Sequence, residues 1–518
     1  MKEQNSALSQ WRAHNKNRPN SPAVIFEERT LKWQDLWLRS NRLANAYLQL
    51  GLTKGDRVQI LLPNCLEFPE IIMAGNKAGL INTSGNYRLT GSELLYQLND
   101  CKARALVIYS AEQYERISAI RNELPELEHV IVISDTPATE AISYESLLND
   151  ASSEDPRMDV LPEDIGLFMY TSGTTGFPKG VMRSVGSIDA GSESMSIELG
   201  LTSDDIFLAA APMYAAATVG CVSSALFSGG TVVVMPHFDP SLVLQYIERY
   251  KISWIFMVPI MYEWVLDQPP EVLGEVDISS LRHVIACGAP LHNKTAERMV
   301  KFFKEAAVSN WLGASELGYM AYYDYKKGLK AEGCVGKPIY GIELEIFDEK
   351  GSPLEKGHPG VLYARGKTLF DGYFNREEST REAFLEGGWG TVGDVAIQDA
   401  EGDFFIVDRK NDMIISGGIN VYPVEIEQVI QKIEGVEDNA VIGVPDEKWG
   451  ESVKALVVKK PGSTLTSEDI VSACKKYLAG FKVPKSVEFI DIIPRSPIGK
   501  TLKKELRKKY WEGKEHVI

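Results

Sequence analysis

A short apolar run that leads directly into a loop of glycines and hydroxyls constrains this chain most. Residues 165–170 read Ile-Gly-Leu-Phe-Met-Tyr, which predicts a short buried strand. Residues 171–180 follow as Thr-Ser-Gly-Thr-Thr-Gly-Phe-Pro-Lys-Gly. A strand that opens into hydroxyls, bare amides and one ammonium group has the chemistry to hold a polyphosphate. Glycine favours this use because, without a Cβ, its backbone can approach phosphate oxygens closely.

On the residues alone, two interpretations of this loop stay open. Stretches rich in Gly, Ser and Thr are usually surface turns that bind nothing. The spacing also differs from the P-loop pattern Gly-x-x-x-x-Gly-Lys-Ser/Thr, since Lys179 is followed by Gly180. The loop therefore predicts either a phosphate site or an ordinary turn.

Length and composition predict a globular protein of more than one domain. A chain of 518 residues is too long for one compact core, and 44% hydrophobic with 24% charged residues is ordinary for a soluble protein. The net charge of -16 argues against a nucleic-acid partner, which needs a basic face. The six cysteines include no Cys-x-x-Cys pair, which predicts reduced, mostly buried thiols in a cytoplasmic protein.

Two stretches bear on membranes. The first six residues, Met-Lys-Glu-Gln-Asn-Ser, contain no apolar run, so we expect no signal peptide. Residues 206–236 carry no charge, but prolines and glycines interrupt them and residues 231–235 predict a strand. A buried α/β core explains this stretch better than a transmembrane helix, and no transmembrane segment is expected.

Alternating strand-like and helix-like segments predict an α/β fold over most of the chain. Up to about residue 160, buried strands are expected at residues 57–62 and 105–109, and a helix at 36–50 that Gly51 ends. The alternation continues from about 161 to 335, which predicts a second α/β layer system. Residues 342–346 then alternate with period two, and a small β-rich subdomain is expected to about residue 407. The last part is mixed α/β, and its basic stretch at 503–509 predicts a solvated helix face.

The loop at 171–180 resembles the phosphate loop of the acyl-adenylate-forming superfamily, which includes acyl-CoA synthetases, firefly luciferase and the adenylation domains of peptide synthetases. Six further segments resemble the superfamily in the same order. The resemblance implies a large N-terminal domain, residues 1–408, of two α/β subdomains and a small β-rich subdomain. It also implies a small mobile α+β C-terminal domain, residues 409–518. In the loop, the residues expected to hold the phosphates of ATP are Thr171, Ser172, Gly173, Thr174, Thr175, Gly176 and Lys179, with Lys179 also catalytic.

Two further segments resemble nucleotide contacts of the superfamily. Residues 287–291, Cys-Gly-Ala-Pro-Leu, resemble the turn that lies along the adenine. Residues 311–316, Trp-Leu-Gly-Ala-Ser-Glu, resemble its Tyr-Gly-x-Thr-Glu segment. A carboxylate is the ligand that Mg²⁺ prefers, so Glu316 is the expected catalytic metal ligand. The other expected ATP contacts are Gly288, Ala289, Pro290, Leu312, Gly313 and Ser315. Standing alone, each segment would be an ordinary turn or a surface glutamate.

Residues 388–394, Gly-Trp-Gly-Thr-Val-Gly-Asp, resemble the superfamily's ribose-binding segment. Asp394 is expected to accept hydrogen bonds from the ribose, with Arg409 helping to hold it. Asn411 stands at the pivot position between the domains, where the superfamily usually has Asp or Lys. Asparagine tolerates positive φ, so it can serve as the hinge.

Coenzyme A contacts are also implied by resemblance. Gly417 and Gly418 lie in a Ser-Gly-Gly segment whose glycines line the pantetheine tunnel in CoA ligases. Trp449 is expected to stack on the adenine of CoA, and Lys482 to bind its phosphates. Both have structural alternatives, as a buried tryptophan and a solvated lysine.

Residues 494–500, Pro-Arg-Ser-Pro-Ile-Gly-Lys, resemble the segment that carries the catalytic lysine, here Lys500. When a carboxylate attacks the α-phosphate of ATP, charge gathers on oxygens of both partners. An ammonium between them stabilises that transition state. The alternative is that Lys500 only begins the basic C-terminal tail.

The function implied is a carboxylic acid:CoA ligase that uses ATP, Mg²⁺ and CoA. Its acid is expected to be apolar (fatty, aryl or alicyclic), in a pocket lined by Tyr214, Ala215, Ala216 and Trp311. The alanines would widen this pocket and Trp311 would narrow it. Within the superfamily, two alternatives stay open: an enzyme that loads a carrier protein and a luciferase-like oxygenase. A third alternative is a weakly catalytic acyl-nucleotide-binding protein, because Leu312 and Val392 replace the usual Tyr and Thr. A homodimer is left open as well.

Overall fold

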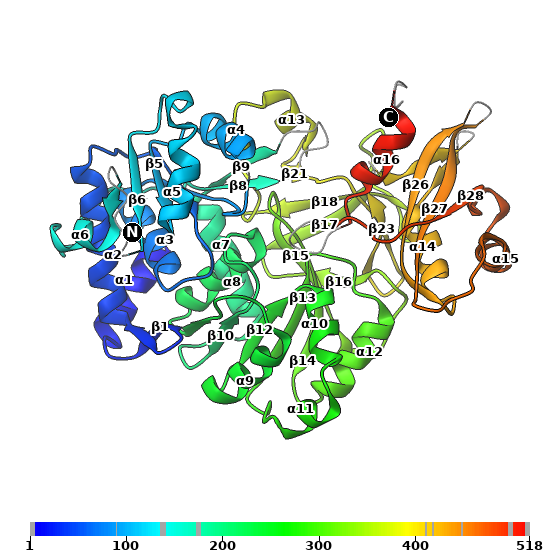
Figure 1. The fold of residues 1–518 in the computed structure, drawn as a ribbon, viewed down its shortest axis with the longest axis horizontal. Coiled ribbons are helices and arrows are strands. Elements are labelled where there is room, and N and C mark those ends of the chain that lie inside the picture. Colours follow the sequence, from blue (N-terminus) through cyan, green and yellow to red (C-terminus); the bar gives the residue numbers. More distant parts are fainter. Residues whose placement is uncertain are drawn as a thin grey trace. The chain divides into compact units, whose positions relative to one another are not determined.

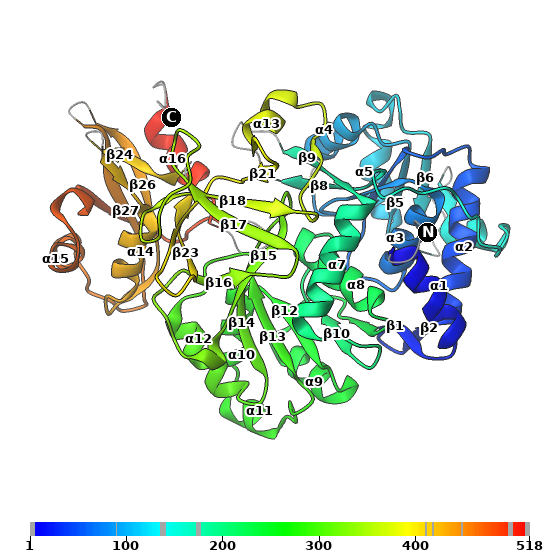
Figure 2. The same ribbon diagram turned by 180° about the vertical axis from the view of Figure 1, so that it is seen from behind.

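A computed structural model describes residues 6–89, 91–134, 141–171, 178–409, 412–416, 419–446, 449–495 and 501–512, with the side chains of 409, 415, 419, 420 and 450 left aside. The chain divides into two compact units. Unit 1 comprises Met1–Lys330, Lys337–Leu344 and Ala364–Gly390, and unit 2 comprises Ala331–Gly336, Glu345–Tyr363 and Thr391–Ile518. Figures 1 and 2 show the elements of both units in two views.

The first sheet of unit 1 is parallel in its middle and antiparallel at one end. Its order in the described residues is β19 (Gly372–Tyr373), β9 (Lys179–Ser184), β8 (Ile165–Thr171), β4 (Ile81–Ser84), β3 (Arg57–Leu61), β5 (Ala105–Ile108), β6 (His129–Val132) and β7 (Ile142–Ser143). The strands β3, β5 and β8 are mostly buried, as expected where helices cover both faces of a sheet. The strands predicted at 57–62, 105–109 and 165–170 are thus confirmed.

The second sheet of unit 1 carries the predicted adenine and glutamate segments. Its order is β2 (Arg29–Lys32), β1 (Pro22–Phe26), β11 (Thr231–Val234), β10 (Ile206–Ala209), β12 (Trp254–Met257), β13 (His283–Cys287), β14 (Ala307–Ala314) and β15 (Gly318–Asp324). Residues 206–236 form β10, a helix and β11, so the predicted α/β core is confirmed. Among the described residues, no helix combines the length and apolar character needed to cross a membrane.

Helices of unit 1 fill the space between and around these sheets. α7 contacts β8, β9 and β15, while α8 contacts α7, β10, β11 and β14, so this helix pair lies between the two sheets (Figure 1). On the first sheet, α4 and α5 contribute to one apolar core. The helices are α1 (Ala7–Asn17), α2 (Trp33–Gln49), α3 (Glu67–Ala78), α4 (Gly91–Cys101), α5 (Ala111–Ser118), α6 (Tyr144–Asn149), α7 (Val185–Leu199), α8 (Ala216–Phe227), α9 (Pro240–Tyr250), α10 (Pro259–Leu266), α11 (Pro270–Glu275), α12 (Asn293–Phe302) and α13 (Glu377–Glu382).

Two sequence predictions about unit 1 need correction. The helix expected at 36–50 begins three residues earlier, because the Asp35 carboxylate accepts from the Lys32 amide and so caps the first turn. The boundary expected near residue 160 is wrong, because each of the two sheets contains strands from before and after this residue. Val24 of β1 pairs with β11 of the second sheet, and Leu167 of β8 pairs with β4 of the first. Alternation predicts elements, but it does not predict their partners.

Unit 2 contains a β-rich part and a smaller α+β part. Its strands are β22 (Asp394–Gln398), β23 (Phe404–Arg409), β24 (Ile414–Ser416), β25 (Ile419–Val421), β26 (Val436–Asp446), β27 (Gly450–Lys459) and β28 (Ser486–Phe489). Three strands contain residues of both units: β16 (Cys334–Pro338), β17 (Ile342–Phe347) and β18 (Gly360–Gly366). β26 and β27 form a long antiparallel pair whose core also receives α14 (Pro423–Gln431) and α15 (Ser467–Tyr477). The predicted period-two strand at 342–346 is confirmed as β17.

The basic stretch forms α16 (Lys503–Trp511), but the prediction of a solvated face is wrong for part of it. The Lys503 side chain is only 10% exposed, and its Nζ lies 2.9 Å from Glu427 Oε1. Arg507 forms an ion pair with Asp412, whereas Lys509 is 57% exposed. The acidic partners come from distant segments, so the sequence pattern of this stretch could not reveal them. All six cysteines are buried, as predicted.

Candidate active site

The two ends of the predicted phosphate loop lie opposite each other. Thr171 closes β8 and Lys179 opens β9, and the two residues pair across the antiparallel strands. Residues Ser172, Gly173, Thr174, Thr175 and Gly176 of the loop lie outside the described residues. The Lys179 ammonium donates to the Ser379 hydroxyl at 2.9 Å. Among the described residues it pairs with no carboxylate, so its charge remains available to an anion.

Glu316 lies beside these loop ends. It follows β14 and is 8% exposed. Its Oε1 accepts from the Tyr373 hydroxyl at 3.0 Å and from the Thr171 hydroxyl at 3.4 Å. The fold therefore brings together the glutamate and the start of the loop, which are 145 residues apart in the chain.

A segment that the sequence analysis missed connects Glu316 with strand β9 at the end of the loop. We call this segment, residues 370–374, the strap. The Phe370 amide donates to the Glu316 carbonyl at 2.7 Å. On the other side, the Phe374 amide donates to the Gly180 carbonyl at 2.8 Å, and β19 pairs with β9. At Gly372, φ is +130°, and a Cβ there would lie 2.8 Å from Thr380 Cγ2. A side chain at this position would be strained and crowded, so the strap requires glycine here, but a single glycine in the sequence does not reveal that requirement.

Tyr373 of the strap touches both functional groups. Besides its bond to Glu316, its ring centroid lies 5.1 Å from Lys179 Nζ. Burial and the charge of Glu316 raise the pKa of Tyr373. The phenol therefore stays protonated at neutral pH and acts as a donor to the carboxylate.

Arg183 is a second residue that the sequence analysis missed. This buried guanidinium on β9 donates to the Ser315 carbonyl at 3.4 Å and to the Ser187 hydroxyl at 3.1 Å. Burial lowers the pKa of Arg183 to about 10, although the charges of Asp371 and Glu316 oppose the change. Arg183 remains a cation at neutral pH, so it holds the Ser315–Glu316 turn and offsets part of its negative charge.

The two predicted nucleotide segments end neighbouring strands. Cys287, the last residue of β13, pairs with Trp311 of β14. After Cys287 the chain turns at Gly288, where φ is +90°, and continues through Ala289 and Pro290. The β14 side carries Leu312 and Gly313, where the pairing with β15 shifts register. Carboxyl ends of parallel strands are a common place for ligand sites in α/β sheets.

The predicted acyl-pocket residues come from α8 and β14. Tyr214, Ala215 and Ala216 stand at the start of α8 and are partly buried. The Tyr214 ring meets the Tyr87 ring edge-on at 6.0 Å. Trp311 is 2% exposed and is packed among other aromatic rings.

In unit 2, Asp394 is 7% exposed and lies opposite Arg409 across β22 and β23. The Arg409 side chain is outside the described residues, as are Asn411, Gly417, Gly418 and Lys500. The Trp449 side chain is 43% exposed, so the alternative of a buried tryptophan is excluded. Lys482 forms an ion pair with Glu425, so its charge is partly offset.

Comparison with known proteins supplies the family. The model for the AMP-binding enzymes matches residues 11–374, and the model for the AMP-binding enzyme C-terminal domain matches residues 425–500. The chain belongs to the AMP-binding enzyme family. The predicted membership of the acyl-adenylate-forming superfamily, in its acyl-CoA synthetase branch, is therefore confirmed.

Individual relatives cover almost the whole chain. A feruloyl-CoA synthase from Amycolatopsis sp is 35% identical over 98% of this chain and 99% of its own length. A long-chain-fatty-acid–CoA ligase from Escherichia coli O157:H7 is 33% identical over 94% of this chain and 91% of its own length. The crystal structure of ATP-bound MatB from Rhodopseudomonas palustris superposes with a TM-score of 0.89 at 28% identity, covering 98% of this chain and 99% of that chain. These matches confirm the predicted arrangement of a large N-terminal and a small C-terminal domain.

In this AMP-binding enzyme, Glu316 suits a magnesium ion. Among the described residues, hydroxyl groups donate to its carboxylate and no lysine or arginine forms an ion pair with it. Its oxygens are hard donors of the kind that Mg²⁺ prefers. The residues present therefore fit the metal that the nucleotide chemistry implies.

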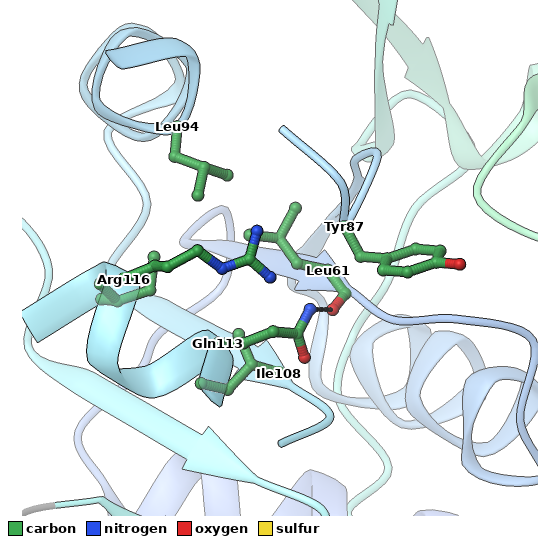
Figure 3. A pocket seen from close by; sticks show the side chains of 7 residues that line it. Leu61, Tyr87, Leu94, Ile108, Gln113 and Arg116 are labelled. Carbon is green, nitrogen blue, oxygen red and sulfur yellow. Dashed lines mark hydrogen bonds between the residues drawn. The ribbon is translucent and has the colours of Figure 1, made fainter. Parts of the chain in front are cut away.

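A narrow recess in unit 1 lies apart from these residues (Figure 3). It is lined by Leu61, Tyr87, Leu94, Ile108, Gln113, Arg116 and Ile117, and the Gln113 amide donates to the Leu61 carbonyl at 3.1 Å. The recess is too tight for a water molecule and belongs to the core between the first sheet and α4–α5. It is a feature of core packing and does not serve as a substrate site.

Proposed function

We propose that this AMP-binding enzyme is an ATP-dependent carboxylic acid:CoA ligase. In the first half-reaction, an acid oxygen attacks the α-phosphorus of ATP, the bond to the bridging oxygen of pyrophosphate breaks, and acyl-AMP forms. In the second, the thiolate of CoA attacks the acyl carbon and AMP leaves. The observation that carries the proposal is Glu316, whose carboxylate accepts from Thr171 at the start of a phosphate-type loop and from Tyr373 of the strap.

The phosphates of ATP would be held by the loop residues Thr171, Ser172, Gly173, Thr174, Thr175 and Gly176. Lys179 supports this role because its ammonium has hydroxyl and aromatic neighbours and no carboxylate partner among the described residues. Glu316 would hold Mg²⁺, which supplies positive charge for the triphosphate oxygens. Little covalent chemistry by the protein is needed, so catalysis would come from position and charge.

For the nucleoside, we propose a role for each of three separate segments. Gly288, Ala289 and Pro290 would lie along the adenine, with Leu312, Gly313 and Ser315 beside the nucleotide. Asp394 and Arg409 would hold the ribose. Buried carboxylates such as Asp394 are suited to accepting hydroxyl hydrogen bonds.

We propose that residues 409–518 form a mobile domain that brings Lys500 to the reacting centre during adenylation. Asn411 would be its pivot. In the second half-reaction, Gly417 and Gly418 would line the pantetheine path, and the exposed Trp449 ring offers a surface for the adenine of CoA. Lys482 could bind a CoA phosphate after exchanging its Glu425 partner.

The acid would be apolar, as the names of the relatives, a feruloyl-CoA synthase and a long-chain-fatty-acid–CoA ligase, also suggest. We place the reaction in the cytoplasm, where six buried thiols stay reduced. Size-exclusion chromatography tests the homodimer that the sequence analysis left open.

The test is a pyrophosphate-release assay over fatty, aryl and alicyclic acids, with and without CoA. We expect release with at least one acid and an acyl-CoA thioester when CoA is present. Release of pyrophosphate without a thioester to free CoA would instead favour loading of a carrier protein. No release with any acid would contradict the ligase proposal.

A further inference from the structure

Tyr319 of β15 bridges the two elements that carry the predicted acyl pocket. Its hydroxyl donates to the Ala217 carbonyl in the first turn of α8 at 2.7 Å. The same hydroxyl lies 3.2 Å from the Cys221 sulfur, one turn further along α8. The residue is 8% exposed. The Tyr319 side chain therefore crosses the space between the second sheet and α8.

Two glycines make room for this ring. A Cβ at Gly220 of α8 would lie 3.2 Å from Tyr319 Cε2, and a Cβ at Gly313 of β14 would lie 3.2 Å from Tyr319 Cδ1. Both distances are shorter than normal carbon contacts, which are about 3.5–4.0 Å. The ring thus fills space that these two missing side chains leave free.

Trp311 holds the ring from a third side and is itself fixed. Its ring meets Tyr319 edge-on, with centroids 5.5 Å apart and planes at 85°. Its other contact is a stack on Tyr322 at 4.8 Å and 15°. The Trp311 indole nitrogen donates to the Ser309 hydroxyl at 2.9 Å. Neither ring can swing aside without losing packing and a buried hydrogen bond.

We infer that Tyr319 closes the far end of the acyl pocket, so that the enzyme accepts aryl and short-to-medium-chain acids and excludes long-chain acids. The inference rests on the proposed function and names the size of its substrate. Ala215 and Ala216 widen the start of the pocket, but the space that small residues open deeper along α8 is already filled by the phenol ring. Tyr319 is a specificity-determining residue, and its effect depends on the volume of the ring.

The test compares Tyr319→Ala and Tyr319→Leu with the wild type on cinnamate, hexanoate and hexadecanoate. In the wild type we expect kcat/KM to favour cinnamate and hexanoate over hexadecanoate. In both variants the ratio of kcat/KM for hexadecanoate to that for hexanoate rises by about tenfold or more, because each added methylene in an apolar pocket changes binding appreciably. Tyr319→Phe keeps the ring and therefore keeps the wild-type order of acids.

Tyr323→Ala is the matched control on the same strand. Tyr323 is also buried, and its hydroxyl donates to a backbone carbonyl, that of Gly328, at 2.9 Å. Its loss destabilises β15 similarly but leaves the order of acids unchanged. If Tyr319→Ala does not fold, Tyr319→Leu, which retains a side chain in the core, carries the comparison.

Calorimetric titration of the same acids without ATP separates this inference from the proposed function. If the Tyr319 variants bind longer acids more tightly but no variant ligates any acid, the role of Tyr319 in the acyl pocket would be supported and the proposed ligase activity would be contradicted. A wild type that uses hexadecanoate as well as hexanoate would overturn the inference. So would an unchanged ratio in both folded variants, in binding as well as in ligation.

Discussion

Replacing Tyr373 with phenylalanine tests whether the strap orients Glu316. The change removes one hydroxyl, which lies 3.0 Å from Glu316 Oε1. It leaves the backbone pairing of Tyr373 with Val181 in place, and the ring stays beside Lys179. Glu316 retains the Thr171 hydroxyl at 3.4 Å as a donor. The substitution therefore isolates one hydrogen bond to the proposed metal ligand.

The expected loss can be worked from that bond. A hydrogen bond to a charged group contributes about 1.5–3 kcal/mol. The 3.0 Å separation is longer than the 2.5–2.7 Å typical of a hydroxyl donating to a carboxylate, so the lower end applies. A loss of about 1.4 kcal/mol corresponds to a factor of ten. We expect Tyr373→Phe to lower kcat/KM for ATP by about tenfold and to raise the magnesium concentration at half-maximal rate.

Pyrophosphate release at varied ATP and magnesium concentrations measures this effect, and thioester formation from supplied acyl-AMP serves as the second readout. The second half-reaction needs no triphosphate, so it should keep its wild-type rate. Tyr262→Phe is the matched control, because the buried Tyr262 hydroxyl donates to the Ile285 carbonyl at 2.9 Å, in the core behind β12 and β13. An unchanged magnesium dependence in Tyr373→Phe, or equal losses in both half-reactions, would refute the reasoning.

Three further predictions concern other parts of the chain. Lys500→Ala should slow adenylation about a hundredfold or more while sparing thioester formation from supplied acyl-AMP, and equal losses in both assays would exclude its proposed role. Lys503→Ala should destabilise the C-terminal unit by about 3 kcal/mol in chemical denaturation, because it leaves Glu427 without its buried partner, whereas the exposed Lys509→Ala should have little effect. Burial lowers the pKa of Lys503 and the charge of Glu427 raises it, and the net change is an increase. The contribution of Lys503 to stability is therefore fully present below the usual pKa of lysine and is lost only as the pH rises above it. Burial raises the pKa of Asp189 to about 7, so wild-type stability relative to Asp189→Asn should decline as pH rises from about 4 to 7, and a flat difference would contradict this.

The fold was predictable where burial leaves a pattern in the sequence. The strand at 105–109 is a continuous apolar run and the strand at 57–62 is mostly apolar, because helices cover both faces of a parallel sheet. Strand partners were not predictable in the same way. β1 lies in the second sheet although about 200 residues separate Val24 from its partner Val232, and no local pattern encodes such a pairing.

The residues of the candidate site were also predictable only in part. The segments around Thr171, Lys179 and Glu316 carry recognisable chemistry, so the sequence could nominate them. Tyr373 and Arg183 could not be nominated, because a tyrosine after a glycine and an arginine in a strand carry no distinctive chemistry by themselves. Their importance comes from contacts that only the fold creates. The Tyr373 phenol donates to the Glu316 carboxylate, and the buried Arg183 guanidinium donates to the carbonyl of Ser315, the residue before it.

The Val392 departure bears on the alternative of a weakly catalytic protein. Where the superfamily has threonine before Gly-Asp, this chain has valine, which removes a hydroxyl from the turn that leads to Asp394. The neighbouring Thr391 supplies one instead: its hydroxyl accepts from the Gly393 amide at 3.0 Å and donates to the Leu362 carbonyl at 2.7 Å. Asp394, at the start of β22, therefore follows a turn that the two hydrogen bonds of the Thr391 hydroxyl stabilise. The substitution therefore gives no structural reason to expect a lost ribose contact, and it no longer supports the alternative of a weakly catalytic protein.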